Sequence, residues 1–284
     1  MHGMRIDEFA KLISDERETM DFLYKRKKGI SRVECPFCRS RKFYLMKRKR
    51  VRCRKCRKDF DFLKETYFGK VRISYSKWLT IIKLFELEVS ARKASMQSGL
   101  SYPTTLKSYD TIRHCIARGL SKKDKKLKGK IEADEAYFGG RRKGMRGRGS
   151  KNKVIVFGIL ERNGKVKVSI IGDASSQSLM NETVRKIRRG SIVYTDKWRG
   201  YDSLMFCGYK HLQIDHAYKF KQDKVYINGI EGFWSFAKER LIKHYGISPG
   251  KFLYYIKEQE WRYNNRGKDL FSLLVQIMLG AVIL

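Results

Sequence analysis

Four cysteines near the amino terminus have the spacing of a metal site. Cys35 and Cys38 form one C-x2-C pair, and Cys53 and Cys56 form a second pair after 14 intervening residues. Each pair can lie on a short turn that presents two thiolates to one ion, and two such turns complete a tetrahedral site. Four soft thiolates favour zinc over hard cations, so we predict a structural Zn²⁺ that supports folding rather than chemistry. The alternative is a set of buried or redox-active thiols.

Three acidic residues in the second half of the chain have the chemistry of a different metal site. Asp134 lies in the strand-like segment IEADEAYFGG, Asp196 follows the apolar segment IVYT, and Glu231 lies in the helix-like segment NGIEGFWSFAK. Carboxylate oxygens are the ligands of Mg²⁺, and a pair of Mg²⁺ ions can activate a water or a 3′-hydroxyl and stabilise the leaving oxygen of a phosphoryl transfer. Each acid taken alone is equally well explained as a helix cap or an ion-pair partner.

The charge of the chain indicates its partner. The 64 Lys and Arg residues against 29 Asp and Glu give a net charge of +35. Nucleic acid is the usual partner of such a protein, because Lys and Arg neutralise its phosphates and release counterions. The most apolar stretch, residues 271–284, is shorter than the roughly 20 residues of a membrane span, and the first 16 residues lack the apolar core of a secretion signal. We expect an intracellular protein that binds no membrane.

Apolar periodicity predicts a helical first half around the cysteine-rich segment. Helices are expected over residues 6–25 and 78–91, followed by a short helix that ends near Gly99 and a longer one over 103–117. A glycine turn between two short helices is typical of a DNA-binding helix-turn-helix, although an ordinary helical hairpin has the same pattern. Twelve Lys and Arg residues and no acid lie between positions 35 and 58, among them Arg48, Arg50, Arg52 and Arg57. We therefore expect the ribbon to contact DNA.

The second half has a different period. A basic hinge over residues 121–130 precedes a mixture of strands and helices, and Asn163-Gly164 is a strong signal for a two-residue hairpin between two of the strands. We predict strands over 131–138, 154–160, 166–171, 192–195 and 211–214, and helices over 176–188, 227–243 and 249–263. Asn228, Glu231 and Lys238 are spaced three and then seven residues apart, so they share one helix face.

Five motifs together resemble the prokaryotic insertion-sequence transposases of the ISXO-type group, which have an acidic catalytic triad. The similar segments are residues 74–79 (SYSKWL), 134–140 (DEAYFGG), 194–201 (YTDKWRGY), 228–234 (NGIEGFW) with Lys238, and 260–264 (EWRYN). The resemblance implies a multidomain α+β protein with an N-terminal zinc ribbon and helix-turn-helix and a C-terminal ribonuclease H-like α/β domain. The expected domains are a helical segment 1–28, a ribbon 29–70, a helix-turn-helix region 71–120, a linker 121–130 and a catalytic domain 131–284.

The resemblance also implies roles for individual residues. Asp134 and Asp196 would bind Mg²⁺ or Mn²⁺, and Glu231 would be the third acid. Related transposases vary at the third position, which leaves Asn228 as a competing ligand. Lys238 would contact DNA phosphate near the scissile bond.

Other residues of the catalytic half have weaker interpretations. The basic loop 141–153 is either a path for the DNA backbone or a solvated loop. His216 is better explained as a core or phosphate-contacting residue than as a ligand. Trp198 and Trp234 are more simply core residues than platforms for an unpaired base.

The activity implied is metal-dependent strand cleavage at insertion-sequence ends, followed by strand transfer into target DNA without a covalent protein–DNA intermediate. Double-stranded DNA is the expected partner, with the protein a homo-oligomer on DNA, cytoplasmic and associated with the nucleoid. Two alternatives remain: a DNA-binding regulator derived from an inactive transposase, and a structure-specific nuclease on the same core.

Overall fold

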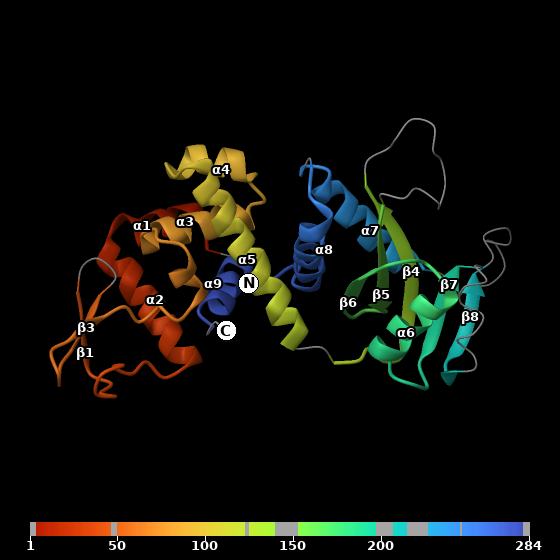
Figure 1. Cartoon of the computed structure of the whole chain (residues 1–284), viewed down its shortest axis with the longest axis horizontal. Coiled ribbons are helices and arrows are strands. Elements are labelled where there is room, and N and C mark those ends of the chain that lie inside the picture. Colours follow the sequence, from red (N-terminus) through yellow and green to blue (C-terminus); the bar gives the residue numbers. More distant parts are fainter. Residues whose placement is uncertain are drawn as a thin grey trace. The chain divides into compact units, whose positions relative to one another are not determined.

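The computed structural model describes residues 4–46, 50–122, 125–139, 153–196, 207–214, 227–244 and 246–280. The chain forms two compact units (Figure 1). The first comprises Met1–Gly119 together with Gly267–Leu284, and the second comprises Leu120–Arg266. None of the helices in the described ranges is both long and apolar enough to cross a membrane.

The first unit begins with two helices where the sequence predicts one. Helix α1 spans Ile6–Ser14 and α2 spans Glu16–Ile30. The break lies at Asp15, whose backbone is extended and whose Oδ1 accepts a hydrogen bond from the Arg17 amide at 2.8 Å. An aspartate at this position caps the second helix, and this local hydrogen bond interrupts the apolar periodicity.

A small antiparallel sheet carries the cysteine pairs. Its strands are β1 (Phe43–Leu45), β2 (Val51–Cys53) and β3 (Asp59–Phe60), in the order β1-β2-β3. The sheet is too short to bury a core of its own, which is consistent with a ribbon held together by a metal.

The helix-turn-helix follows as predicted. After the 3-10 turn η1 (Tyr67–Lys70), helices α3 (Tyr75–Glu86), α4 (Ala91–Ser98) and α5 (Tyr102–Lys122) follow in turn. Gly99 ends α4 with a φ of 66°, a left-handed conformation that glycine adopts without strain. The indole of Trp78 on α3 donates to the Phe68 carbonyl at 2.9 Å and joins the helices to the segment that leaves the ribbon.

The carboxyl-terminal helix α9 (Leu270–Met278) belongs to the first unit. This differs from the expected catalytic domain over 131–284, which ends instead at Arg266 in the structure. Phe271 is fully buried, its ring lies 5.6 Å from that of Phe9, and the Lys27 amine donates to the Leu279 carbonyl at 2.8 Å. The apolar stretch that was too short to span a membrane therefore completes the core of the amino-terminal unit.

The second unit is built on a five-stranded sheet. Its strands are β4 (Lys130–Phe138), β5 (Val154–Glu161), β6 (Val166–Ile171), β7 (Ile192–Asp196) and β8 (Lys210–Ile214). They lie in the order β6-β5-β4-β7-β8, in which β4, β5 and β6 are antiparallel and β7 and β8 run parallel to β4. This is the ribonuclease H-like arrangement, as predicted.

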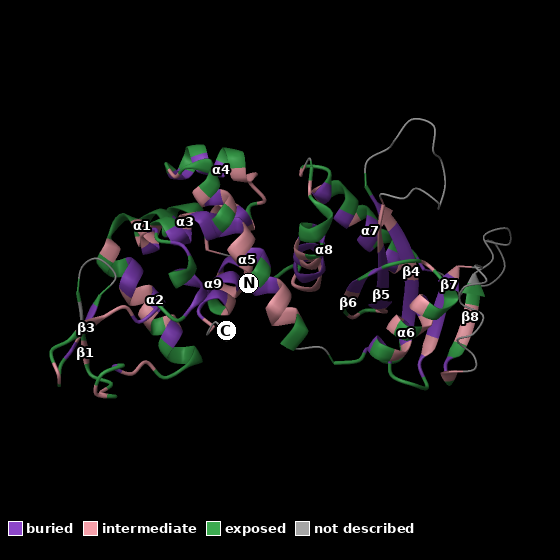
Figure 2. Ribbon diagram, viewed as in Figure 1, coloured by how far each residue is buried: buried purple, intermediate pink, exposed green. Residues whose placement is uncertain are grey.

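Helices cover both faces of this sheet. One apolar core joins alternate residues of β4, such as Ala136 and Phe138, to α7 (Asn228–Leu241) and α8 (Pro249–Asn264). The other core joins Ile131 and Ala133 to α6 (Ser176–Lys186) on the opposite face. The central strands β4 and β5 are buried over most of their length, whereas the helices have exposed outer sides (Figure 2). Side chains that share a face of β4 therefore alternate, and even-numbered residues point toward α7 and α8.

The helix α8 seals the outer edge of strand β6. Asn264 accepts a hydrogen bond from the Val166 amide and donates one to the Val166 carbonyl, both at 2.8 Å. One turn earlier, Glu260 accepts from the Val168 amide at 3.1 Å, and Lys257 donates to the Val168 carbonyl at 2.7 Å. These side chains take the place of a neighbouring strand, so Glu260 and Asn264 of the EWRYN motif are used to satisfy the backbone of an edge strand.

The burial of α9 predicts a specific stability effect. Phe271→Ala should lower the free energy of unfolding of the first unit by about 3–5 kcal/mol, because it removes a fully buried ring from the core. Gln276→Ala, on the exposed side of the same helix, should change it by less than about 0.5 kcal/mol. Urea unfolding measures both, and equal effects would show that α9 is not part of this core.

Candidate metal centres and active site

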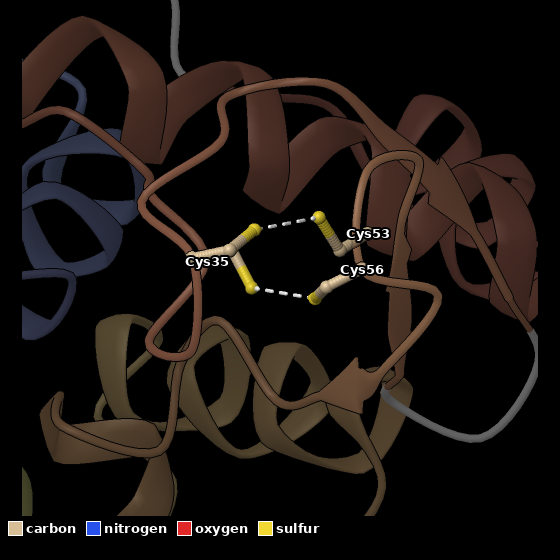
Figure 3. A group of neighbouring side chains, drawn as sticks. Cys35, Cys53 and Cys56 are labelled. Carbon is tan, nitrogen blue, oxygen red and sulfur yellow. Dashed lines mark hydrogen bonds between the residues drawn. The ribbon is translucent and has the colours of Figure 1, made fainter.

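The four cysteines converge as predicted. Their sulfur atoms all lie within 4.8 Å of one another, with Cys35 Sγ 3.6 Å from Cys56 Sγ and Cys38 Sγ 3.5 Å from Cys53 Sγ. In Figure 3 the Cys35 side chain faces those of Cys53 and Cys56 across the space between the two turns. A tetrahedral zinc with Zn–S bonds of about 2.3 Å requires sulfurs about 3.8 Å apart. The donor set and its spacing fit a structural Zn²⁺.

The two turns that carry the thiols have the same backbone conformation. Arg39 and Arg57, each one residue after a C-x2-C pair, have φ values of 57° and 64°. The Arg39 amide donates to the Cys35 carbonyl at 2.9 Å, and the Arg57 amide donates to the Cys53 carbonyl at 3.0 Å. Non-glycine residues rarely adopt this conformation, so its repetition in both turns indicates a backbone held for metal ligation.

The thiol environment favours ionisation at one ligand. Although burial opposes it, backbone N–H groups of Cys56 and Lys55 together with the Cys38 thiol lower the pKa of Cys53 to about 6. At Cys56 the Lys58 backbone N–H lowers the pKa, but burial and the other three sulfurs together raise it to about 11. Without a cation, ionisation is favoured at Cys53 and opposed at Cys56. Zinc binding must displace the remaining protons and is therefore weakened by acid.

Several ribbon cations have partners within the ribbon. Arg52 Nε lies 2.7 Å from Asp59 Oδ1, so its charge is paired. The Arg54 guanidinium lies 4.4 Å from the centre of the Tyr44 ring. Arg48 lies outside the described residues. The predicted DNA contact of the ribbon therefore depends on cations other than Arg52.

The sheet places the first two predicted acids side by side. Strands β4 and β7 are parallel neighbours, and Glu132 pairs with Tyr194. Asp134 and Asp196 lie two residues farther along their strands, so they share the same level and the same face, with Asp134 in the middle of β4 and Asp196 at the carboxyl end of β7. Adjacent strands are about 4.8 Å apart, which brings the two carboxylates within range of one cation. The sequence predicted Asp196 just beyond a strand, and it is the last residue of β7.

Without a cation, the environment of this pair disfavours full ionisation of Asp134 and leaves an oxygen of Asp196 without a hydrogen bond. Burial, with the negative charges of Glu135 and Asp196, raises the pKa of Asp134 to about 7. Asp196 Oδ1 is buried and has no hydrogen-bond partner in the described parts of the chain. A buried carboxylate oxygen without a donor is costly unless a cation binds it. The two aspartates therefore fit a divalent metal with oxygen ligands.

Trp234 supports Asp134 from helix α7. Its indole Nε1 donates to Asp134 Oδ2 at 3.0 Å, and the side chain is 4% exposed. The indole lies against Gly158 on β5, which pairs with Asp134; a Cβ at Gly158 would come within 2.5 Å of the ring. Glycine at this position therefore allows the indole to lie over the sheet. Burial confirms that Trp234 is a core residue, with an additional hydrogen bond to the site.

The candidates for the third ligand lie on helix α7. Asn228, Glu231 and Lys238 all lie exposed on α7, as predicted for one helix. In the described residues, the cysteine quartet is the one group of three or more Cys, His, Asp or Glu side chains with all ligand atoms within 4.8 Å. Asp134, Asp196 and Glu231 therefore do not all have ligand atoms within 4.8 Å of one another. The loop 141–153 (apart from Lys153), Trp198 and His216 lie outside the described residues.

One acidic residue near the site was missed by sequence reasoning. Glu132 lies two residues before Asp134 on the same face of β4 and is 1% exposed. The period of two along a strand was the available signal, because it places Glu132 in the row of side chains that faces α7.

Comparison with known proteins identifies the chain. Residues 126–264 match the ISXO2-like transposase domain, and residues 15–59 match the transposase zinc-ribbon domain. An uncharacterized transposase-like protein of Haemophilus influenzae is 38% identical over 120 residues, which are 42% of this chain and 98% of that protein. The chain belongs to the ISXO2-like transposases.

A solved structure of the Mos1 strand transfer complex also aligns with this transposase. The alignment covers 72% of this chain and 74% of the other at 10% identity, with a TM-score of 0.29. A similarity this low carries no argument about the site. The family matches cover the ribbon and the second unit, while helix α9 lies beyond both of them.

The thiol geometry predicts a test of the zinc site. Cys35→Ser should reduce bound zinc from about one ion per chain to a small fraction and unfold the ribbon, because it removes one of four ligands. Metal analysis of the purified protein measures this. Cys207→Ser, in the second unit, should retain full zinc. A wild-type protein without zinc would contradict the assignment.

The raised pKa of Asp134 predicts a pH-dependent stability effect. The folded state keeps this proton up to pH about 7, whereas the unfolded chain releases it near 3.8. Folding therefore becomes less favourable as the pH rises between these values, and the penalty persists above them. Asp134→Asn should stabilise the transposase at pH 8 relative to wild type, and the gain should vanish near pH 4.

Urea unfolding at several pH values without added Mg²⁺ tests this effect. Asp173→Asn is a control of opposite sign, because hydrogen bonds from Ser175 and Ser178 lower the pKa of Asp173 to about 2. A pH-independent difference between wild type and Asp134→Asn would contradict the assigned pKa.

Proposed function

We propose that this transposase cleaves DNA strands at the ends of its insertion sequence and joins the freed 3′-hydroxyl to target DNA. The observation that carries the proposal is the adjacent pair Asp134 and Asp196, which includes a buried carboxylate oxygen without a hydrogen-bond donor, in a chain of a transposase family. Asp196 ends β7 beside Asp134 of the parallel strand β4, and open sheets bind their ligands at the carboxyl ends of their strands.

Asp134 and Asp196 would hold Mg²⁺ or Mn²⁺ in this reaction. Bound divalent metal supplies an activated water or 3′-hydroxyl and stabilises the leaving oxygen. The protein positions its two carboxylates on rigid strands, and the Trp234 indole orients one of them. This arrangement needs no covalent protein–DNA intermediate, because the attacking group is a water or a DNA hydroxyl.

The path of α7 favours Glu231 over Asn228 as the third ligand. The Ile230 amide is bonded to Glu132 and the Trp234 indole to Asp134, so α7 ascends beside β4 in the same direction. Glu231 lies between these two contacts. Asn228 precedes Ile230 by two residues. Along the helix axis it is therefore about 3 Å farther than Ile230 from the level of Asp134. Glu231 would complete the site when its carboxylate joins Asp134 and Asp196 on the metal.

DNA would be bound by basic groups outside the metal site. Lys238 is exposed one turn beyond Trp234 on α7, where its amine can reach a phosphate near the metal. The ribbon and the exposed Arg92 and Lys93 of α4 would recognise the element ends. Because two ends must be cut and joined together, we expect the transposase to work as a homo-oligomer on double-stranded DNA.

The two aspartates support this function over a DNA-binding regulator, and strand transfer would distinguish it from a nuclease. A DNA-binding regulator would need neither aspartate, yet both are present with the burial and mutual repulsion that suit a cation. A structure-specific nuclease would share the cleavage step but would not join strands.

Asp134→Asn and Asp196→Asn should each lower Mn²⁺-dependent cleavage of an element-end duplex by at least about a hundredfold, because each removes a metal ligand. Binding to the same duplex, measured by fluorescence anisotropy, should stay within about twofold. Glu231→Ala should behave like the aspartate variants, whereas Asn228→Ala should retain most activity.

Controls and outcomes are distinct for each claim. Asp173→Asn, an exposed acid of the same unit, should cleave like wild type. Full cleavage activity of either aspartate variant would contradict the proposed site. If Asn228→Ala loses cleavage while Glu231→Ala keeps it, Asn228 and not Glu231 is the third ligand. Cleavage without strand transfer by the wild type would favour the nuclease.

A further inference from the structure

A buried charged group lies directly beneath the two aspartates. Glu132 on β4 is 1% exposed, and both of its carboxylate oxygens are used. Oε1 accepts from Arg162 Nε at 2.9 Å, and Oε2 accepts from the Ile230 amide at 2.9 Å. The first bond joins β4 to the end of β5, and the second joins β4 to the first turn of α7.

Arg162 extends this contact to the strand that carries the second aspartate. Its guanidinium lies 3.8 Å from the centre of the Tyr194 ring on β7. Tyr194 precedes Asp196 by two residues, as Glu132 precedes Asp134, and Ile230 is followed by Glu231. The contacts of Glu132 and Arg162 therefore connect β4, β7 and α7, the three elements that carry the proposed ligands. Each contact lies one or two residues before the ligand on its element.

Close approach of the helix depends on a glycine. A Cβ at Gly229 would lie 2.8 Å from Glu132 Oε2, so any larger residue would push the carboxylate away from the helix. The first turn of a helix also presents unpaired N–H groups and a partial positive charge, which favour a carboxylate. Gly229 and the helix terminus together hold α7 against Glu132.

We propose that Glu132 is a positioning residue that sets the distance between Glu231 and the two aspartates. This inference rests on the proposed function, since it assumes that the three acids share a metal site. A buried ion pair contributes little more stability than apolar residues of the same size. Glu132 instead orients its neighbours. One carboxylate oxygen holds the start of α7, and the other holds Arg162, whose guanidinium packs against the Tyr194 ring on strand β7.

Glu132→Gln tests this role, because glutamine keeps the size of the side chain and removes its charge. We expect the Mn²⁺ concentration for half-maximal cleavage to rise about 10- to 100-fold, as is usual when a group that orients a metal ligand is altered. Without DNA, the increase in melting temperature caused by Mn²⁺ should shrink. This second readout does not depend on catalysis.

Glu258→Gln is the matched control. Glu258 is also buried in the second unit, and its Oε1 accepts from Arg262 Nε at 2.8 Å, so the variant breaks the same kind of ion pair. We expect a loss of stability similar to that of Glu132→Gln, with the Mn²⁺ dependence of wild type.

A second pair of variants tests the geometry. Gly229→Ala should weaken the Mn²⁺ response, because the methyl group displaces the Glu132 carboxylate. Adding Glu132→Asp, which withdraws the carboxylate by roughly the length of one methylene, should restore part of the response. Because relief of the clash would also restore packing, the melting temperature without Mn²⁺ is measured alongside, and its recovery without recovery of the Mn²⁺ response would contradict the positioning role.

The outcomes separate this inference from the proposed function. If Asp134→Asn abolishes the Mn²⁺ response while Glu132→Gln keeps it, or alters it no more than Glu258→Gln, the positioning role is wrong and the metal site stands. If wild type itself shows neither a Mn²⁺-dependent shift in melting temperature nor cleavage, both claims are wrong.

Discussion

The burial of two carboxylates on adjacent parallel strands is the constraint around which the second unit is built. Asp134 and Asp196 lie at the same level because β4 and β7 are paired in parallel register, and burial makes their charges costly. The surrounding side chains relieve only part of this cost, through one hydrogen bond from Trp234. A rigid pair of acids with an unpaired oxygen on Asp196 is suited to a cation, and its rigidity comes from the sheet rather than from loops.

The transposase has two clusters of like charge with opposite chemistry. In the ribbon, four soft thiols converge and ionisation is opposed at Cys56, so a bound zinc would complete a fold with too little core. In the sheet, hard carboxylates occupy a fold that is already well packed, so a cation bound there would be available for the proposed reaction. The same electrostatic problem therefore supports structure in one unit and chemistry in the other.

The chain enters the second unit once and returns to the first. Residues 120–266 are inserted between the helix α5 and the helix α9 of the first unit. The amino-terminal unit is complete only when the carboxyl-terminal helix has packed against Phe9. The helix before it, α8, satisfies the edge of β6 through Glu260 and Asn264. Both units thus depend on segments that lie late in the sequence.

The sequence alone determined the local features of this protein. The cysteine spacing defined the zinc quartet, the apolar periods located most of the strands and helices, and the motifs around Asp134 and Asp196 indicated the family, because each depends on residues near one another in the chain. Tertiary structure decided what depends on distant residues. Capping at Asp15 divided a predicted helix, α9 joined the first unit, and strand register placed Asp134 beside Asp196. Glu132 gained its importance only there, because its partners Arg162 and Ile230 lie 30 and 98 residues away, and no local pattern encodes such contacts.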